Sequence, residues 1–299
     1  MKSLLYALIF SLGAHLCAMN QGPNNHANLK KAGTESATLA LADEHYTAGR
    51  YAQAKEVFEI VLERATTTNE LYKANQALAD LHAHRLPKAP ENVEMAFNYY
   101  INALKVLEAL EQINTKEVCL PHRAALLRNL TKICFESGKL AQAISYGTQS
   151  LAIESHPIII APLCHMIGVS TRSTDAAQSK LYLERGVNAL LQAVNNKEQI
   201  LEATPEAAQL YGQLHKELGN TLFTQKQFKE AEVNYKKGMR FLQAMGDKAD
   251  IWVQMGLLYQ RDGKKLLARA NFECAAEEHV KSVNERAYNA AKAWLAKHP

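Results

Sequence analysis

Residues 214–238 alternate apolar and polar positions with the period of two amphipathic helices. Leucines recur every four residues from Leu214 to Leu222 and form one apolar stripe. After a short polar break, a second stripe begins at Phe228 and continues to Tyr235 and beyond. The pattern predicts two helices, the first ending near Gln225, that pack against each other as an antiparallel hairpin.

Two small residues interrupt these stripes. A glycine inside a helix costs about 1 kcal/mol relative to alanine, a loss that close approach of another helix can offset. We therefore expect Gly219 to face Ala231, and Gly256 to face Ala268, at the contacts between paired helices, with no role in ligand binding.

The same arrangement of small and aromatic residues recurs along the chain. Gly256 precedes Ala268 by twelve residues, as Gly219 precedes Ala231. Two weaker copies lie around Ala96 and Ser179, and the segment LPKAPEN interrupts the first of them. The landmark positions of the repeats are Ala42, Ala54, Phe58, Ala96, Tyr100, Ala143, Gly219, Ala231, Tyr235, Gly256, Ala268 and Phe272.

These landmarks resemble the tetratricopeptide repeat, a helix–turn–helix unit of about 34 residues. The resemblance covers residues from about Ser36 to His279, but the spacing between equivalent positions is longer than in the family, which predicts lengthened helices or loops. It implies an all-α, right-handed solenoid of about six helical hairpins. A terminal helix from Lys281 to His298 would cap the array, with four side chains covering the last repeat: Ala287, Ala290, Ala291 and Trp294.

The first residues have the layout of a secretory signal peptide. One lysine precedes an apolar run that ends near Ala18 and is shorter than a membrane span requires. We expect cleavage after Ala18 and a periplasmic or secreted protein. Lipidation at Cys17 and a retained anchor are the alternatives, and they are the only membrane contact that we expect. The expected organisation is a signal peptide at 1–18, a disordered or extended segment at 19–35, a repeat array at 36–280 and the capping helix at 281–299.

Composition and motifs point away from several other classes of function. The net charge of +4 is small and the basic residues alternate with acidic ones, which argues against nucleic-acid binding. Phosphate-binding loops, nucleophile elbows and metal-ligand clusters are not found, so we expect no catalytic residues, no metal and no cofactor. If a disulfide forms, the candidate pair is Cys134 with Cys164, because the first helices of successive repeats pack side by side.

The resemblance implies a protein-interaction scaffold whose first helices line a concave groove for a peptide or a partner helix. Residues three before and one after the small landmark of each first helix fall on one helix face. The groove residues that this register gives are Gln76, Asp80, Arg128, Lys132, Lys216 and Asn220. Gln254 is added because it stands where chaperone-binding members of the family have an asparagine.

The expected partner is a protein or peptide, and the cations in this set favour an acidic or carboxylate-bearing segment. Lys216 and Asn220 resemble a pair that grips a terminal carboxylate in chaperone-binding members of the family. If the cations are exposed, reversing Arg128 and Lys216 to glutamate should weaken binding without affecting folding. The alternative is that these residues are only solvated helix positions. A peptide-sensing regulator and an enzyme with a site in the divergent middle repeats are the other functions that the sequence leaves open.

Overall fold

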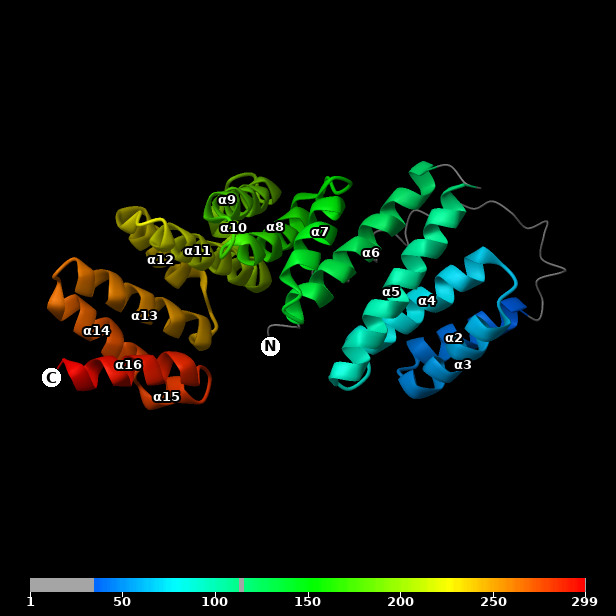
Figure 1. Cartoon of the computed structure of the whole chain (residues 1–299), viewed down its shortest axis with the longest axis horizontal. Coiled ribbons are helices and arrows are strands. Elements are labelled where there is room, and N and C mark those ends of the chain that lie inside the picture. The colour runs from blue at the N-terminus through cyan, green and yellow to red at the C-terminus, as the bar shows by residue number, and fades with distance from the viewer. Residues whose placement is uncertain (1–34, 113–115, 299) are drawn as a thin grey trace. The chain divides into compact units, whose positions relative to one another are not determined.

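The computed structural model describes residues 35–112 and 116–298. They form two compact units, the first ending at Ser155 and the second beginning at His156. Every secondary-structure element in these residues is a helix (Figure 1). No Gly-, Ser- or Pro-rich segment marks the boundary between the units. The expected signal peptide, its cleavage site, Cys17 and nearly all of the expected segment 19–35 lie outside the described residues.

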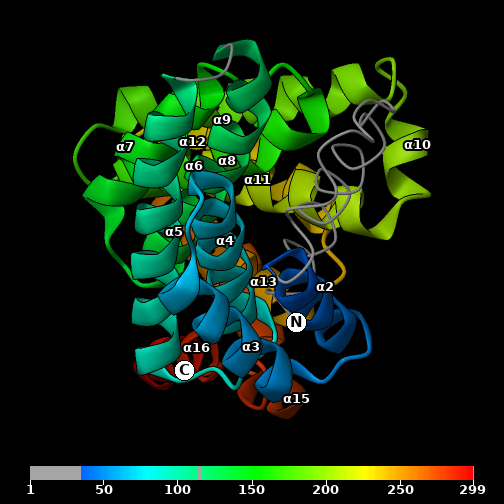
Figure 2. The same ribbon diagram turned by 90° about the vertical axis from the view of Figure 1, so that its right-hand side faces the viewer.

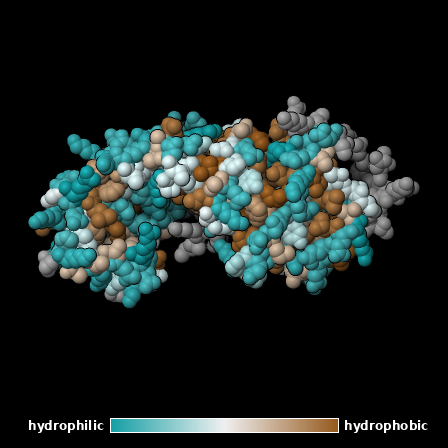
Figure 3. All heavy atoms as spheres, viewed as in Figure 1, coloured by the Kyte–Doolittle hydropathy of each residue, from teal (hydrophilic) through white to brown (hydrophobic). Residues whose placement is uncertain are grey.

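The first unit contains three helical hairpins. They pair α2 (Glu35–Thr47) with α3 (Tyr51–Arg64), α4 (Thr68–His84) with α5 (Pro90–Glu111), and α6 (Lys116–Glu136) with α7 (Leu140–Leu151). Within this unit α3 also packs on α4, and α5 packs on α6, so α4, α5 and α6 lie side by side in Figures 1 and 2. Helices α3, α4 and α5 each bury an apolar face. Polar side chains cover much of the face seen in Figure 3, with apolar areas between them.

The second unit contains three more hairpins and the C-terminal helices. The pairs are α8 (Pro157–Thr171) with α9 (Ala176–Ala193), α11 (Pro205–Thr224) with α12 (Phe228–Phe241), and α13 (Met245–Arg261) with α14 (Lys265–Ala275). A short helix, α10 (Glu198–Glu202), lies between the first two pairs. The predicted all-α fold of about six repeated hairpins is confirmed.

The longer spacing between repeats has the causes that the sequence predicts. The hairpin of α4 and α5, which the segment LPKAPEN interrupts, has a loop at 85–89 and a 22-residue second helix, α5. Asn92 ties this loop to the helix, because its side-chain amide donates a hydrogen bond of 2.8 Å to the carbonyl of Pro87. The widest spacing, from Ser179 to Ala231, contains α10, which the apolar pattern did not predict.

All twelve landmark residues are buried. The glycines lie at helix contacts, as predicted, but their nearest neighbours are aromatic rings rather than the alanines. A Cβ atom on Gly219 would lie 2.6 Å from two ring carbons of Tyr235, and one on Gly256 would lie 2.8 Å from two ring carbons of Phe272. The alanines Ala231 and Ala268 are fully buried beside them. Glycine is therefore required here because a ring occupies the place of its side chain.

Four of the hairpins share one turn geometry. The residue before the second helix's N-cap has a positive φ in each: Gly49, Gly138, Lys226 and Gly263. The next amide closes the turn on a carbonyl of the first helix, as Gln227 does with Leu222 at 2.9 Å. Lys226 is the only residue of this set with a side chain, and the left-handed conformation is strained for such residues.

We expect Lys226→Gly to raise the free energy of unfolding by about 0.5–1 kcal/mol, because glycine adopts this conformation without strain. Both tryptophans of the chain, Trp252 and Trp294, lie in the second unit, so urea unfolding followed by tryptophan fluorescence measures the change. Ala270→Gly, in the exposed interior of α14, is the control and should lower stability by a similar amount. A loss of stability in Lys226→Gly would contradict the strain at this turn.

The C-terminal cap differs from the predicted single helix. It consists of α15 (Glu278–Lys281), whose C-cap is Ser282, and α16 (Glu285–Lys297). Asn284 caps α16 by accepting a hydrogen bond from the amide of Ala287. Three of the four predicted covering residues contribute: Ala287 and Ala291 are buried, and Trp294 stacks on Phe272 with ring centroids 4.3 Å apart. Ala290 is exposed, so its predicted role is wrong.

Candidate protein-binding site

A pocket of about 300 Å³ lies on the first unit between α2, α3 and α4. Two of the predicted groove residues, Gln76 and Asp80, line it. The equivalent residues of α2, three before and one after Ala42, are Leu39 and Asp43, and they line it as well. Hence the consecutive first helices α2 and α4 present the same two register positions to one hollow. We call this hollow the inner pocket; its other lining residues are Tyr46, Phe58, Lys73 and Ala77.

Asp80 is held firmly at one side of the inner pocket. It accepts a hydrogen bond from the hydroxyl of the buried Tyr100, and that hydroxyl accepts one of 3.1 Å from the side-chain amide of Asn129. Burial raises the pKa of Asp80 to about 6, although the Tyr100 hydrogen bond and the cations Arg85 and Lys132 act in the opposite direction. The carboxylate is thus less well compensated in the folded protein than it would be in water.

This shift predicts that Asp80 makes the first unit less stable at neutral than at acid pH. The protonated carboxyl is favoured by folding, so its contribution is complete below the ordinary pKa of 3.8 and is lost as pH rises through 6. Asp80→Asn, which can still accept from Tyr100, should become more stable relative to the wild type as pH rises from 4 to 7.5, by up to roughly 3 kcal/mol. Thermal unfolding followed by circular dichroism at both pH values measures this difference. An equal difference at the two values would contradict it.

The predicted groove residues of α6 occupy a different environment. Arg128 and Lys132 are only 6% and 3% exposed. Arg128 forms an ion pair within the first unit with Glu154, which follows α7. Burial lowers the pKa of Lys132, although the carboxylates of Glu136 and Asp80 raise it in part. The expectation that these cations are exposed is wrong, and so is the alternative that they are merely solvated.

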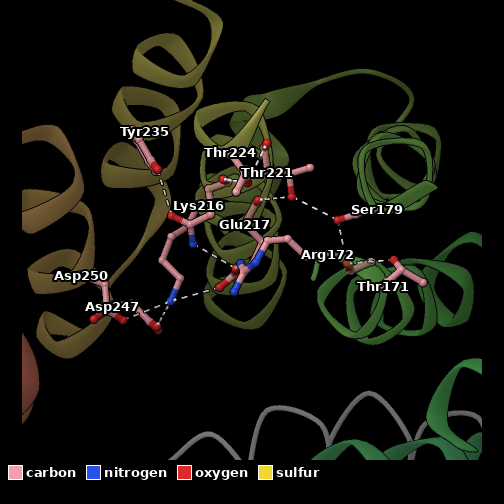
Figure 4. Close-up of polar contacts among 12 residues, drawn as sticks. Thr171, Arg172, Ser179, Lys216, Glu217, Thr221, Thr224, Tyr235, Asp247 and Asp250 are labelled. Carbon is pink, nitrogen blue, oxygen red and sulfur yellow. Dashed lines mark hydrogen bonds and ion pairs between the residues drawn. The ribbon is translucent and has the colours of Figure 1, made fainter. Parts of the chain in front are cut away.

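In the second unit, Lys216 is also buried and lies at the centre of an ion-pair network (Figure 4). Its Nζ lies 2.7 Å from Oδ1 of Asp247 and 3.5 Å from Oδ2 of Asp250, both on α13. It also lies 3.6 Å from Oε1 of Glu217, which pairs with Arg172 at the end of α8. Burial alone would lower the pKa of Lys216, but the surrounding carboxylates raise it above its ordinary value. The lysine is therefore charged and already neutralised by the fold.

The pair Lys216 and Asn220, which resembles a carboxylate grip, closes on a carboxylate of the chain itself. Asn220 donates a hydrogen bond of 3.0 Å to Oε2 of Glu217, and its own oxygen accepts one of 2.9 Å from the hydroxyl of Tyr235. Gln254 is half-buried on α13. Reversing Lys216 or Arg128 to glutamate would place an anion beside carboxylates that these residues pair with, so we now expect these changes to impair folding.

The described residues contain few features of other kinds of site. No three His, Cys, Asp or Glu side chains among residues 35–112 and 116–298 are grouped as a metal site would require. Cys134 and Cys164 are free thiols in this structure, and burial raises the pKa of each, to about 11 and about 12. None of the helices described has the length and apolar character of a membrane span.

Comparison with known proteins supports the repeat assignment. No family profile matches the sequence, and no curated protein matches it significantly. Among solved structures, PilF of Pseudomonas aeruginosa is similar over 88% of this chain and 97% of its own, with 16% identity and a TM-score of 0.53. BtubC of P. vanneervenii is similar over 89% and 94%, with 14% identity and a TM-score of 0.50. A tetratricopeptide repeat protein of Parabacteroides merdae is similar over 86% and 98%, with 11% identity and a TM-score of 0.44.

The chain has the tetratricopeptide-repeat fold. Of the predicted groove residues, Gln76 and Asp80 line the inner pocket. Leu39 and Asp43 were not predicted, because the register was applied only to the first helices α4, α6 and α11. Applying the same offsets to Ala42, which is itself a repeat landmark, would have found both residues.

Proposed function

We propose that this protein is a non-enzymatic interaction scaffold that binds a peptide or helix of a partner protein in the inner pocket. The observation that carries the proposal is the repetition of one register: Leu39 with Asp43 and Gln76 with Asp80 face the same hollow from consecutive first helices. A ligand lying across α2 and α4 would meet the same pair of positions twice. Repeat proteins use such aligned positions to bind extended segments.

The pocket combines the two elements that a protein-binding site needs. Phe58, which is 1% exposed, forms with Ala77 an apolar floor that can receive a partner's side chain. Gln76 and Asp80 are half-buried at the sides and offer polar atoms that can fix the orientation of a ligand. By contrast, two of the cations expected to bind an acidic segment pair with carboxylates of the chain, Arg128 with Glu154 and Lys216 with Asp247. The third, Lys132, is buried, so an acidic partner is not part of the proposal.

Filling the pocket tests this function. Full-length protein is used to capture partners from its own cells, and the captured proteins are compared by quantitative mass spectrometry between variants. We expect Gln76→Trp to capture at least tenfold less of the specific partner than the wild type does, because the indole would occupy the hollow. Gln142→Trp, an exposed position on α7, is the matched control and should capture as the wild type does. Equal capture by Gln76→Trp, with an unchanged melting temperature, would contradict the proposal.

We further propose that the scaffold acts outside the cytoplasm. The support is the sequence of residues 1–18, a lysine followed by an apolar run too short to span a membrane. The N-terminal sequence of the protein isolated from cells should then begin near Met19. An intact Met1 in the cytosolic fraction would contradict export, and a fatty-acylated Cys17 would identify the protein as a lipoprotein instead.

A further inference from the structure

We propose that the inner pocket takes a lysine or arginine side chain of the partner, with its alkyl stem on the apolar floor and its cationic head between Asp43 and Asp80. This inference rests on the proposed function and adds the chemistry of the ligand. It replaces the acidic partner that the sequence favoured with a basic one.

The floor of the pocket suits the stem of such a side chain. Leu39 and Ala77 are half-buried, and both belong to the apolar cluster built around the buried Phe58. Lysine and arginine side chains pack their methylene groups along apolar surface while the charged end stays at a polar edge. Aspartate and glutamate have stems too short to use such a floor fully.

The carboxylates at the edge are arranged to receive a cation. Asp43 and Asp80 occupy the same register position, one residue after Ala42 and Ala79, on two packed hairpins, and both line the hollow. Burial raises the pKa of Asp80 despite the cations near it, which means that its negative charge remains under-compensated. Asp43 is exposed; partial burial raises its pKa and Lys73 lowers it in part. A cationic head placed between them would supply the missing compensation.

The cations already present do not fill this role. Lys73 lines the pocket near Asp43 but is exposed. On the other side, Arg85 and Lys132 act on Asp80, yet Lys132 is buried on α6 and Arg85 is directed to an aromatic wall. An acidic side chain in the pocket would face two carboxylates and a single lining cation, so charge complementarity favours a basic one.

The aromatic wall shows how a guanidinium can be held here. The Arg85 guanidinium carbon lies 5.8 Å from the ring centroid of Tyr46 and 5.5 Å from that of Tyr51, and its Nε donates a hydrogen bond of 3.4 Å to the Tyr46 hydroxyl. Tyr46 also lines the inner pocket. Such cation–π contact is attractive because the ring face carries partial negative charge. A partner's arginine could contact the same ring from the pocket.

A peptide library tests the chemistry. The probes are 12-residue peptides with random flanks and a central Lys, Arg, norleucine, Gln or Glu, applied to the full-length chain at pH 7.5. We expect Lys and Arg to be enriched, with Kd values at least tenfold below those of the norleucine counterparts. Asp43→Asn combined with Asp80→Asn should remove at least tenfold of that affinity. Glu56→Gln combined with Glu91→Gln, two exposed carboxylates on α3 and α5, is the matched control and should change nothing.

The pH dependence gives a second readout. Because the pKa of Asp80 is raised to about 6, lowering the pH from 7.5 to 5 should weaken binding of the lysine peptides in the wild type more than in Asp80→Asn. One outcome is that peptides lose binding to Gln76→Trp, which places them in the pocket, and yet show no preference for a basic central residue. That result would overturn this inference and leave the proposed function standing. Peptide binding that is indifferent to Gln76→Trp, or no binding at all, would overturn both.

Discussion

Lys216→Met is expected to lower the free energy of unfolding of the second unit by about 3–5 kcal/mol. Methionine fills a similar volume but leaves the carboxylate of Asp247, which is 3% exposed, without its cation. Gln209 and Gln213 would still donate hydrogen bonds to that carboxylate, but they cannot neutralise it. Urea unfolding followed by the fluorescence of Trp252 and Trp294 reports on this unit directly.

An exposed ion pair provides the control for this variant. Arg269 and Glu273 on α14 are 2.8 Å apart, and each has about half of its side chain exposed, at 48% and 54%. Surface pairs of this kind contribute about 0–1 kcal/mol, so Arg269→Met should have little effect. If Lys216→Met were as stable as Arg269→Met, the network around Lys216 would not contribute to the fold. Lys216→Met with Asp247→Leu should recover much of the loss, because the unpaired carboxylate is then removed.

Gly219→Leu is expected to destabilise the second unit by roughly 3 kcal/mol, at the upper end of the range for overpacked cores. Even the Cβ atom would overlap the ring of Tyr235, and this ring cannot move freely because its hydroxyl donates to Asn220. The same fluorescence measurement applies. Thr224→Leu, an exposed position on the same helix, should leave the midpoint of unfolding nearly unchanged, and an equally small effect of Gly219→Leu would contradict the hairpin contact.

One hairpin of the chain suggests how this overlap can be relieved. At the register positions of Gly219 and Tyr235, the hairpin of α6 and α7 has Thr131 and Gly147, both buried, so that the larger residue is on the first helix. The double variant Gly219→Thr with Tyr235→Gly carries this arrangement into α11 and α12. It should lose less free energy of unfolding than the sum of the losses in the two single variants. Strict additivity would mean that the two positions do not share one space.

The helices and the helix contacts were predictable because they depend on local periodicity. A four-residue repeat of apolar positions predicts that Leu214, Leu218 and Leu222 of α11 are buried, and the small residue Gly219 marks where the partner helix comes closest. The turn glycines and the loop at 85–89 are local signals of the same kind. Asn284 also carried a local signal, as an N-cap residue, yet the apolar pattern around it masked the break between α15 and α16.

The burial of the charged groove residues was not predictable in this way. Arg128 pairs with a residue 26 positions later, and Lys216 with one 31 positions later, so their partners lie in another part of the repeat array. A helix face that looks solvated in one repeat can be covered by carboxylates from the next. The pocket residues Gln76 and Asp80 were found because their neighbours on α2 leave the face open. Burial, rather than register, decides which of the equivalent positions can meet a ligand.

The ion-pair network of the second unit bears on how repeats come apart. Terminal hairpins of a repeat array commonly fray, because each is held only by its neighbour. Here Glu217 reaches back to Arg172 and Lys216 reaches forward to Asp247, so two consecutive residues of α11 hold both adjoining hairpins. Asp250 extends the chain of contacts to Asn284 in the cap, at 2.8 Å. Detaching α13 would strand a buried ammonium, so the last hairpins should open together, and their amide protons should exchange with solvent at a common free energy.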